Sequence, residues 1–522
     1  MTEPTFIRRG VLAGLLMVLA AGGASAQAPA AHLPATGGAD DVLARYRALL
    51  DQDVLRFTLA QAVEVATLLH PEVRLWQERL DEFPHALREA RAPYLPQLDL
   101  DLQAAQTRDP GFRNSPFFSR LIDDPDAAAG FGGGDPSAFG AFTFGTYLWN
   151  FRLSQTLWDF SYRPAMRGVD LSRARARADL DEVRNGIARD TVVRLIDYLF
   201  GLRTRDVLAE AVRTRARGLT LARDRHELGA AQRLEVLRAR VELSRLRRDL
   251  AAAEDEIMVE QAAINALVGR DQDRGIEVLH ELALPDPLPR LLPPEALAEL
   301  ALEHRPALRR FRIDRQLLDV ERGMAAADAL PEVQATASYG INTFTPSNTY
   351  DLQLHNWNAG VSVTWNLFDG FGTRATLARY DSQRTQTAWQ QNEFESTLEV
   401  LLRNAAADWN AALEAIEDAA IALEEAAEAE RVVAEEIAVG AATTFLRMEA
   451  RQTRREVELD RSRFIRDALA ALAEMKYLVG FPANAPDSVL SEPPRRAADA
   501  ANATDHETGG SAPDDKTTEK SR

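Results

Sequence analysis

The sequence predicts a mainly α-helical fold with a small β part, in which one unit of strand and long helix occurs twice. From Trp357 to Leu367 apolar residues alternate with polar or small ones, which is the two-residue period of a strand with one apolar face. After Phe368-Asp369-Gly370, apolar residues recur at steps of three and four from Phe394 to Ala427. That spacing is typical of a very long helix with a neighbouring helix along one side.

The same order of features occurs in the first half of the chain. The matched pairs are Pro71 with Pro306, Pro96 with Pro331, Trp158 with Phe368, Gly229 with Gly440, and Gly269 with Gly480. The first two pairs lie 235 residues apart, and the other three lie 210 or 211 residues apart. Offsets that stay constant over such lengths indicate internal duplication. The drop in offset places roughly 25 extra residues between Pro96 and Trp158 in the first copy.

The duplication and the composition of the flanking segments predict the organisation of the chain. The expected parts are a signal peptide over 1–26, an N-terminal extension over 27–56, a first repeat over 57–284, a linker over 285–294, a second repeat over 295–481 and a disordered tail over 482–522. The first repeat should contain a β-hairpin over 96–158 and a long helical hairpin over 163–269, and the second should contain the same elements over 331–368 and 372–480. Arg8-Arg9, an apolar run and Ala24-Ser25-Ala26 before Gln27 form the pattern of a cleaved signal peptide.

Local signals refine the first repeat. Thr58 is placed to cap a helix that ends before Pro71, and Pro84 should kink the helix that follows. A change of parity between Phe144 and Tyr147 predicts a bulge or a shift of register in the second strand. The Gly- and Pro-rich segment 108–140 lacks the Gly-Lys-Ser/Thr of a phosphate-binding loop, so we expect a long loop on the extracellular side.

The composition excludes several classes of protein. The chain has 522 residues, no cysteine and a formal charge of −18, which excludes disulfides and argues against nucleic acid as a partner. Its eight histidines form no His-Glu-x-x-His motif and there is no Gly-x-Ser-x-Gly motif, so we expect no enzyme, cofactor or metal site. Beyond the first residues, no apolar run reaches the roughly 18 residues of a transmembrane helix.

Four strands with one apolar face each cannot close a membrane sheet, because the smallest membrane barrels have about eight strands. Three copies would supply twelve strands and would bring their long helices together around a hollow cylinder. The alternative is a secreted trimeric coiled-coil structural protein, without a pore, whose strands pack in an ordinary globular head.

Over residues 57–481 the sequence resembles the TolC-type outer membrane efflux proteins. The matching pieces are Leu-Pro-x-Leu/Val at 95–98 and 330–333, Phe-Asp-Gly at 368–370, Gly-Ala-Ala at both hairpin tips, and Leu-Val-Gly at both repeat ends. The resemblance implies a homotrimer with a 12-stranded β-barrel in the outer membrane and an α-helical barrel in the periplasm. It also implies a periplasmic adaptor (membrane fusion) protein and an inner-membrane pump as partners, and export of small molecules such as drugs and metals, or of proteins.

In that family the hairpin tips close the periplasmic mouth, and acidic residues just past the glycine help to form the constriction. The matching acidic residues are Glu235 and Glu449, and the second copy departs from a doubly acidic gate with Leu446 and Arg447. We expect the two glutamates to narrow the pore and favour cations; the alternative is a solvated helix face.

Two further sets of residues complete the predicted sites. The hairpin tips, where the adaptor would dock, contain Gly229, Ala230, Gly440 and Ala441. The aromatic residues expected at the membrane interfaces are Trp149, Tyr339, Trp357 and Trp365. Packing of these aromatic side chains against a neighbouring helix is the alternative.

Overall fold

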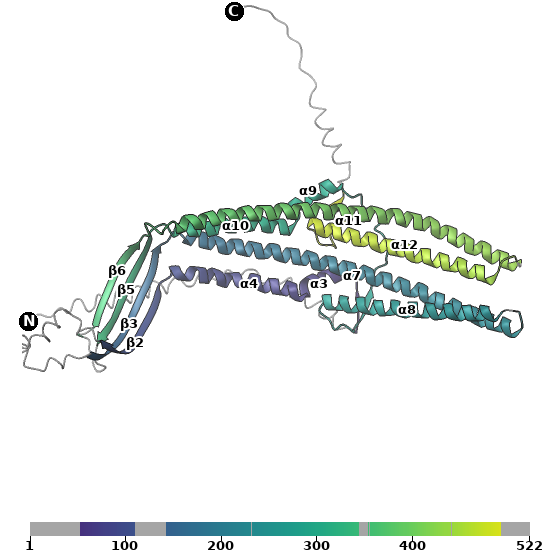
Figure 1. Ribbon diagram of the computed structural model, residues 1–522, viewed down its shortest axis with the longest axis horizontal. Coiled ribbons are helices and arrows are strands. Elements are labelled where there is room, and N and C mark those ends of the chain that lie inside the picture. The colour runs from purple at the N-terminus through teal and green to yellow at the C-terminus, as the bar shows by residue number, and fades with distance from the viewer. Residues whose placement is uncertain are drawn as a thin grey trace, which may run out of the picture.

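The computed structural model describes residues 53–109, 142–230, 232–343, 353, 355–439 and 441–491. The predicted signal peptide, most of the N-terminal extension, most of the 108–140 loop, Gly440 and residues 492–522 of the predicted tail lie outside these ranges. A four-stranded sheet occupies one end of an elongated molecule, and the tips of two helical hairpins lie at the other end (Figure 1).

Helices account for most of the described residues. They are α3 (Leu59–Leu69), α4 (Pro71–Arg91), α7 (Tyr162–Glu227), α8 (Arg233–Leu267), α9 (Pro294–His304), α10 (Pro306–Ala327), α11 (Gly372–Ala438) and α12 (Thr444–Val479), with the short 3-10 helices η1 (Ala92–Tyr94) and η6 (Asp487–Leu490). The strands are β1 (Val54–Phe57), β2 (Gln97–Asp109), β3 (Phe142–Trp158), β4 (Gly275–Val278), β5 (Glu332–Thr343) and β6 (His355–Thr364). The predicted fold class, mainly α with a small β part and a duplicated plan, is confirmed.

The start of each repeat follows from its capping residues. Thr58 accepts a hydrogen bond from the backbone N–H of Gln61, and the Gln61 side chain accepts one from the backbone N–H of Thr58. This capping box satisfies N–H groups that would otherwise lack partners at the start of α3. Helix α3 ends before Pro71, which begins α4, and α4 continues past Pro84 to Arg91.

The two long helices dominate the structure. Helix α7 has 66 residues and α11 has 67, so each extends about 100 Å at 1.5 Å per residue. Helices of this length depend on lateral packing. The return helices α8 and α12 run back along α7 and α11, and α10 lies along both long helices in the half nearer the sheet (Figure 1).

Each repeat has its own apolar core, built from equivalent positions. Tyr198 and Trp409 are buried at an offset of 211 residues, one in each core. The Tyr198 hydroxyl donates a hydrogen bond to the carbonyl oxygen of Ile276 at 3.1 Å. Ile276 belongs to β4, which pairs in parallel with β1 in a two-stranded sheet that the sequence did not predict.

The repeats also end in the same way. The matched contacts join the side chain of Asn265 to the carbonyl oxygens of Gln272 and Arg274, and the side chain of Lys476 to those of Ala483 and Ala485. The offset is 211 residues in every case, from Asn265 to Lys476, from Gln272 to Ala483 and from Arg274 to Ala485. In both repeats, therefore, a buried polar side chain near the end of the return helix holds the segment that follows.

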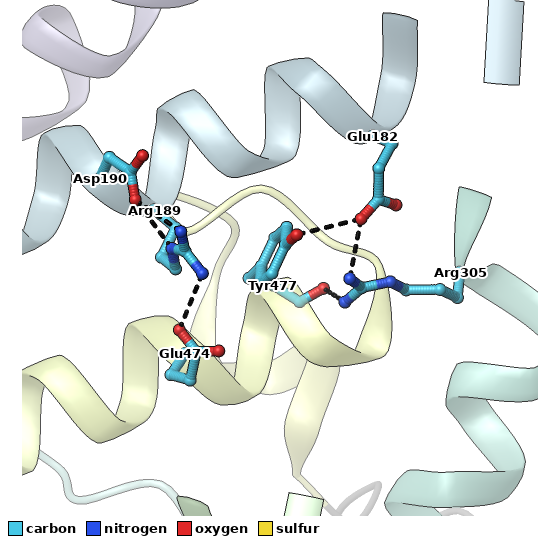
Figure 2. A network of polar contacts seen from close by, with 6 residues as sticks. All are labelled: Glu182, Arg189, Asp190, Arg305, Glu474 and Tyr477. Atoms are coloured by element: carbon cyan, nitrogen blue, oxygen red, sulfur yellow. Dashed lines mark hydrogen bonds and ion pairs between the residues drawn. The ribbon is translucent and has the colours of Figure 1, made fainter. Parts of the chain in front are cut away.

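A buried polar network joins the two repeats where α7, α12 and the start of α10 meet (Figure 2). Arg305, at the start of α10, donates to the Glu182 carboxylate of α7 at 2.7 Å and to the Tyr477 carbonyl oxygen of α12 at 2.5 Å. The Tyr477 hydroxyl donates to the same carboxylate at 3.1 Å. Gly480 ends α12 with a φ of 105°, and a Cβ at this position would lie 2.8 Å from the Cα of Arg305. The motif Leu-Val-Gly thus needs its glycine for two reasons. The backbone is left-handed at this position, and the backbone of Arg305 lies too close to leave room for a side chain.

The predicted bulge between Phe144 and Tyr147 is wrong. The β2–β3 ladder is continuous there, with Phe144 opposite Thr107 and Tyr147 opposite Ala104. The irregularity lies instead in the β3–β5 ladder, where Thr156 faces Gln334 and Trp158 faces Val333. Leu157 is the extra residue.

Candidate functional site

The four-stranded sheet has one apolar face. Its order is β2-β3-β5-β6, with all neighbours antiparallel, so residues opposite each other in the ladders lie on the same face. The apolar face consists of Leu98, Leu100 and Leu102 from β2; Trp149, Phe151, Leu153 and Trp158 from β3; Val333, Ala335, Ala337, Tyr339 and Ile341 from β5; and Trp357, Ala359, Val361 and Val363 from β6. Most of its large side chains are exposed. A contiguous exposed apolar surface of this kind marks contact with a membrane or another protein.

The opposite face is polar. It contains Asp99, Asp101 and Gln103 from β2; Asn150, Arg152 and Ser154 from β3; Gln334, Thr336, Ser338 and Asn342 from β5; and Asn356, Asn358, Ser362 and Thr364 from β6. Arg152 and Asp101 form an exposed ion pair across this face at 3.8 Å. Apolar and polar residues alternate in this way along the strands of outer-membrane barrels, between lipid and lumen.

The bulge at Leu157 places Trp158 on the apolar face. Without an extra residue, the parity of β3 would place Trp158 on the polar face together with Ser154 and Thr156. With it, Trp158 lies opposite Val333 on the apolar face. The bulge therefore sets a tryptophan, in place of Leu157, on the apolar face at the end of β3 that adjoins α7.

Both outer strands of the sheet are open within the described part of the chain. Strand β2 pairs with β3, and β6 pairs with β5, which leaves one edge of each outer strand without a partner strand. Open edges of 13 and 10 residues are ready to pair with another chain. In a bilayer such edges have to be closed, because lipid offers the backbone no hydrogen-bonding partners.

The four predicted interface aromatics lie at two levels. The ring of Trp149 lies 6.0 Å from that of Tyr339, and the Tyr339 hydroxyl is 2.7 Å from Nδ1 of His355. Trp357 is exposed and lies opposite Tyr339 in the ladder. Trp365 follows the end of β6, and its indole N–H donates to the carbonyl oxygen of Ala329 at 3.0 Å. The eight residue steps from Trp357 to Trp365 extend about 26 Å along the strand. At the tilt of about 40° that is typical of barrel strands, this length spans about 20 Å of height, most of the roughly 25 Å of an outer-membrane apolar band.

Sequence reasoning missed four other aromatics at the junction of sheet and helices. They are Trp158, Phe160, Phe368 and Phe371, and all of them are exposed. The rings of Phe368 and Phe371 meet edge to face at 5.4 Å, and those of Trp158 and Phe160 do so at 5.9 Å. Phe371 has a φ of 68°, which is a strained conformation for a non-glycine residue. The signal in the sequence was present, because each pair lies at the end of a predicted β-hairpin.

At the far end, the first hairpin turns at Gly229, whose φ is 75°. Leu228, Gly229 and Ala230 are exposed there. In the second hairpin Val439 and Ala441 are exposed on either side of Gly440, which lies outside the described residues. The residues proposed for adaptor docking are therefore accessible wherever they are described.

The predicted gate residues lie in the first turns of the return helices. Glu235 is half-buried in the first turn of α8, and Glu449 is exposed one turn into α12. Leu446 is exposed, and its backbone N–H donates a hydrogen bond to the side-chain hydroxyl of Thr443. Arg447 beside it is half-buried. The tips of the two hairpins lie at the same end of the molecule (Figure 1). Glu235 lies six residues after Gly229, and Glu449 lies nine residues after Gly440.

A half-buried carboxylate links the two helices of the second hairpin near its tip. Glu430 of α11 accepts hydrogen bonds from Arg451 at 2.8 Å and Arg454 at 2.9 Å, both on α12. Burial raises the pKa of Glu430, but these two hydrogen bonds and the charges of the arginines outweigh it and hold the pKa below its ordinary value.

Two other kinds of site are absent from the described part of the chain. Its helices include none that combines the length and the apolar character needed to cross a bilayer. The same residues contain no group of three or more His, Asp or Glu side chains placed to hold a metal ion.

Comparisons with known proteins identify the class of fold. Residues 297–480 match the model of the outer membrane efflux protein family. The second repeat therefore matches the model of this family, and the resemblance drawn from the sequence is confirmed. No curated protein sequence matches the chain.

Solved structures extend this likeness to both repeats. The chain is similar to CusC, with a TM-score of 0.66 and 12% identity over 84% of this chain and 94% of that one. It is similar to the Campylobacter jejuni CmeC outer membrane channel, with a TM-score of 0.64 and 15% identity over 85% and 89%. The outer membrane protein VceC from Vibrio cholerae gives a TM-score of 0.62 and 19% identity over 82% and 97%. At these identities the likeness establishes the fold of the whole described chain.

Proposed function

We propose that this protein is an outer membrane efflux channel. In this proposal the four-stranded sheet is one third of a membrane-spanning barrel, and the helical hairpins form a tunnel through the periplasm. Three copies supply twelve strands, and small molecules or proteins leave the cell through the common lumen. The chain provides the conduit and no chemistry of its own.

The observation that carries the proposal is the two-faced sheet. Its apolar face is contiguous and exposed, its other face is polar, and its outer strands have open edges. Lipid would cover the apolar face, water in the lumen would solvate the polar face, and neighbouring copies would pair with the edges. A secreted coiled-coil stalk with a globular head would instead bury the apolar face, so no observation favours that alternative.

The aromatic residues fit two membrane interfaces. Trp149, Tyr339 and Trp357 would lie at the outer interface, and Trp365 would lie at the inner one. Aromatic rings prefer this depth because one edge is apolar and the other is polar. The exposed aromatics at the sheet–helix junction would reinforce the inner level.

The hairpin tips would form the periplasmic mouth and dock a periplasmic adaptor protein, which connects the channel to an inner-membrane pump. Support comes from the exposed apolar residues Leu228 and Val439 at the tips, which are available for a protein contact. In a trimer Glu235 and Glu449 would each occur three times around the axis. Such rings of carboxylates would attract cations into the narrowest part of the pore.

Conductance tests the proposed function. Purified protein in detergent, added to one side of a planar lipid bilayer, is expected to produce discrete current steps in potassium chloride. The control is a variant of the mature chain that lacks β6, residues 355–364. It should give no current steps. Full-length protein that is folded by circular dichroism but never conducts would refute the proposal.

A further inference from the structure

A groove lies where α11 and α12 of the second repeat meet α7 of the first. Its volume is about 670 Å³, and it is open to solvent on one side. Six of its eleven lining residues are alanines of α11 and α12, and Val193 and Phe464 add two larger apolar side chains. The groove follows α12 from Phe464 to Glu474, a length of about 15 Å. Its size and its mainly apolar lining are those of a site for a small molecule.

The first repeat is bridged at the place where the second is hollow. The offset of 211 residues that relates the two cores also relates Arg194 to Ala405 and Glu260 to Ala471. Arg194 of α7 and Glu260 of α8 form an ion pair at 3.0 Å across the first hairpin. Both counterparts line the groove. An alanine side chain ends at Cβ and cannot reach across two packed helices, so the second repeat keeps open the space that the ion pair fills in the first.

One carboxylate in the groove is unpaired. Asp408 is exposed on α11 and makes no ion pair or hydrogen bond with the described residues. Its counterpart in the first repeat, Asp197, pairs with Arg466 at 3.5 Å. The two other acidic residues of the lining each pair with an arginine, at 2.6 and 3.3 Å, and the lining contains no basic residue. Asp408 therefore leaves one negative charge in the groove without a counterpart.

This combination of groups suits an organic cation. The alanines can cover an apolar body and release the water from it. The half-buried ring of Phe464 can contact a positive group through its face. Asp408 supplies the opposite charge, which attracts a cation and repels an anion. A bare metal ion would gain nothing from the alanines, so the apolar lining favours a molecule that is both apolar and positively charged.

We propose that the groove binds a drug-sized organic cation, with the positive group at Asp408 and the apolar body on the alanines of α11 and α12. The inference rests on the proposed function and names a class of substrate for the channel. Because the groove is open on one side, a bound molecule can leave it again, as transport requires.

Binding of rhodamine 6G, a fluorescent organic cation, tests the inference. The full mature chain in nanodiscs of neutral phosphatidylcholine is titrated against the dye, and fluorescence polarisation is measured with empty nanodiscs subtracted. Saturable binding is expected. Fluorescein, an anion with the same xanthene ring system, should bind at least about fivefold more weakly, and Asp408→Asn should weaken binding of rhodamine 6G at least about fivefold, because each change removes the attraction between opposite charges.

Two further variants separate the groove from the rest of the surface. Ala405→Arg/Ala471→Glu rebuilds the ion pair of the first repeat in the second and should abolish saturable binding, because the new side chains occupy the groove. Glu417→Gln is the matched control. It removes one charge from an exposed residue of α11 outside the groove and should bind the dye like the unaltered protein.

Conductance of the same preparations distinguishes this inference from the proposed function. A groove variant that conducts but no longer binds the dye would support the inference, since its fold is intact. If the unaltered protein conducts but shows no saturable binding, or if all variants bind the dye equally, the inference is wrong and the channel stands. A folded protein that never conducts would refute the proposed function and the inference with it.

Discussion

Replacing Arg305 with methionine should weaken the joint between the repeats. Arg305 is 5% exposed, donates to Glu182 at 2.7 Å and to the Tyr477 carbonyl oxygen at 2.5 Å, and its guanidinium lies 4.2 Å from the centre of the Tyr477 ring. Arg305→Met keeps the apolar volume but removes the charge, which leaves the Glu182 carboxylate in a poorly hydrated place with the Tyr477 hydroxyl as its remaining partner in this network.

The expected loss follows from the burial of the pair. Removing one partner of a buried ion pair costs about 3–5 kcal/mol. The Glu182 side chain is 24% exposed, so water relieves part of the penalty. We therefore expect about 3 kcal/mol per chain, at the lower end of that range. Unfolding entropy of about 2.1 cal/mol/K per residue gives about 0.8 kcal/mol/K for the roughly 400 described residues, which converts the loss to a fall in Tm of about 4 °C.

Differential scanning calorimetry of the detergent-solubilised protein at one fixed scan rate measures this fall, since unfolding of such an oligomer is expected to be irreversible. Arg309→Met is the matched control. Its ion pair with Asp181 is exposed, so its Tm should change by less than about 1 °C. Adding Glu182→Gln to Arg305→Met should recover at least about 1 °C because no buried charge remains. Equal shifts for the two arginine variants, or no recovery in the double variant, would refute the reasoning.

Three further predictions concern the sheet and the tips. Val361→Arg places a charge on the lipid-facing side of the sheet at a cost of about 2–4 kcal/mol, so it should remove most of the heat-resistant oligomer from outer membranes. Ser362→Arg, on the polar face, should assemble normally. Gels of unheated samples measure the amount of oligomer for both variants. Glu235→Gln combined with Glu449→Gln should reduce the preference for cations, measured as reversal potential in a salt gradient; an unchanged potential would exclude these residues from the gate. Because the pKa of Glu430 is depressed in the folded state, this residue stabilises the hairpin above its ordinary pKa of 4.5, and the stabilisation is lost as the pH falls through the folded value. Glu430→Gln should therefore lower Tm at pH 7 and narrow the Tm difference between pH 7 and pH 3.5; an unaltered pH profile would contradict this role.

The long elements could be predicted from the sequence because their signals are strong and local. Apolar residues at steps of three and four indicated α7 and α11, and strict alternation indicated β6. The helix break at Pro71 and the cap at Thr58 could also be predicted, since proline and capping residues act within one turn of a helix. The duplicated offsets predicted the order of the elements without any knowledge of how they pack.

Features that depend on contacts between distant segments could not be predicted. Strand β1 has four residues and pairs with β4 more than two hundred positions later, so neither strand has a recognisable pattern of its own. The bulge was misplaced because parity was read from one strand. The bulge lies at Leu157 because of the way β3 pairs with β5, and β5 belongs to the second repeat.

The candidate site was accessible from the sequence in part. The alternation of the four strands predicted an apolar face on each strand. The structure shows that the four faces coincide, because the ladders place apolar residues opposite apolar residues. The exposed aromatics Phe368 and Phe371 were missed because they follow the strand rather than belong to it. The roles of Glu235, Glu449 and the hairpin tips remain predictions, since they depend on neighbouring copies.

The native mass of the protein extracted from outer membranes in detergent tests the central claim most directly. One chain of 57.7 kDa, less its predicted signal peptide, contributes four strands, so a closed sheet requires a particle of three chains. Mass spectrometry of the intact complex, or light scattering corrected for detergent, should give three times the mass of the mature chain. A monomer, or a protein released by osmotic shock without detergent, would contradict the channel.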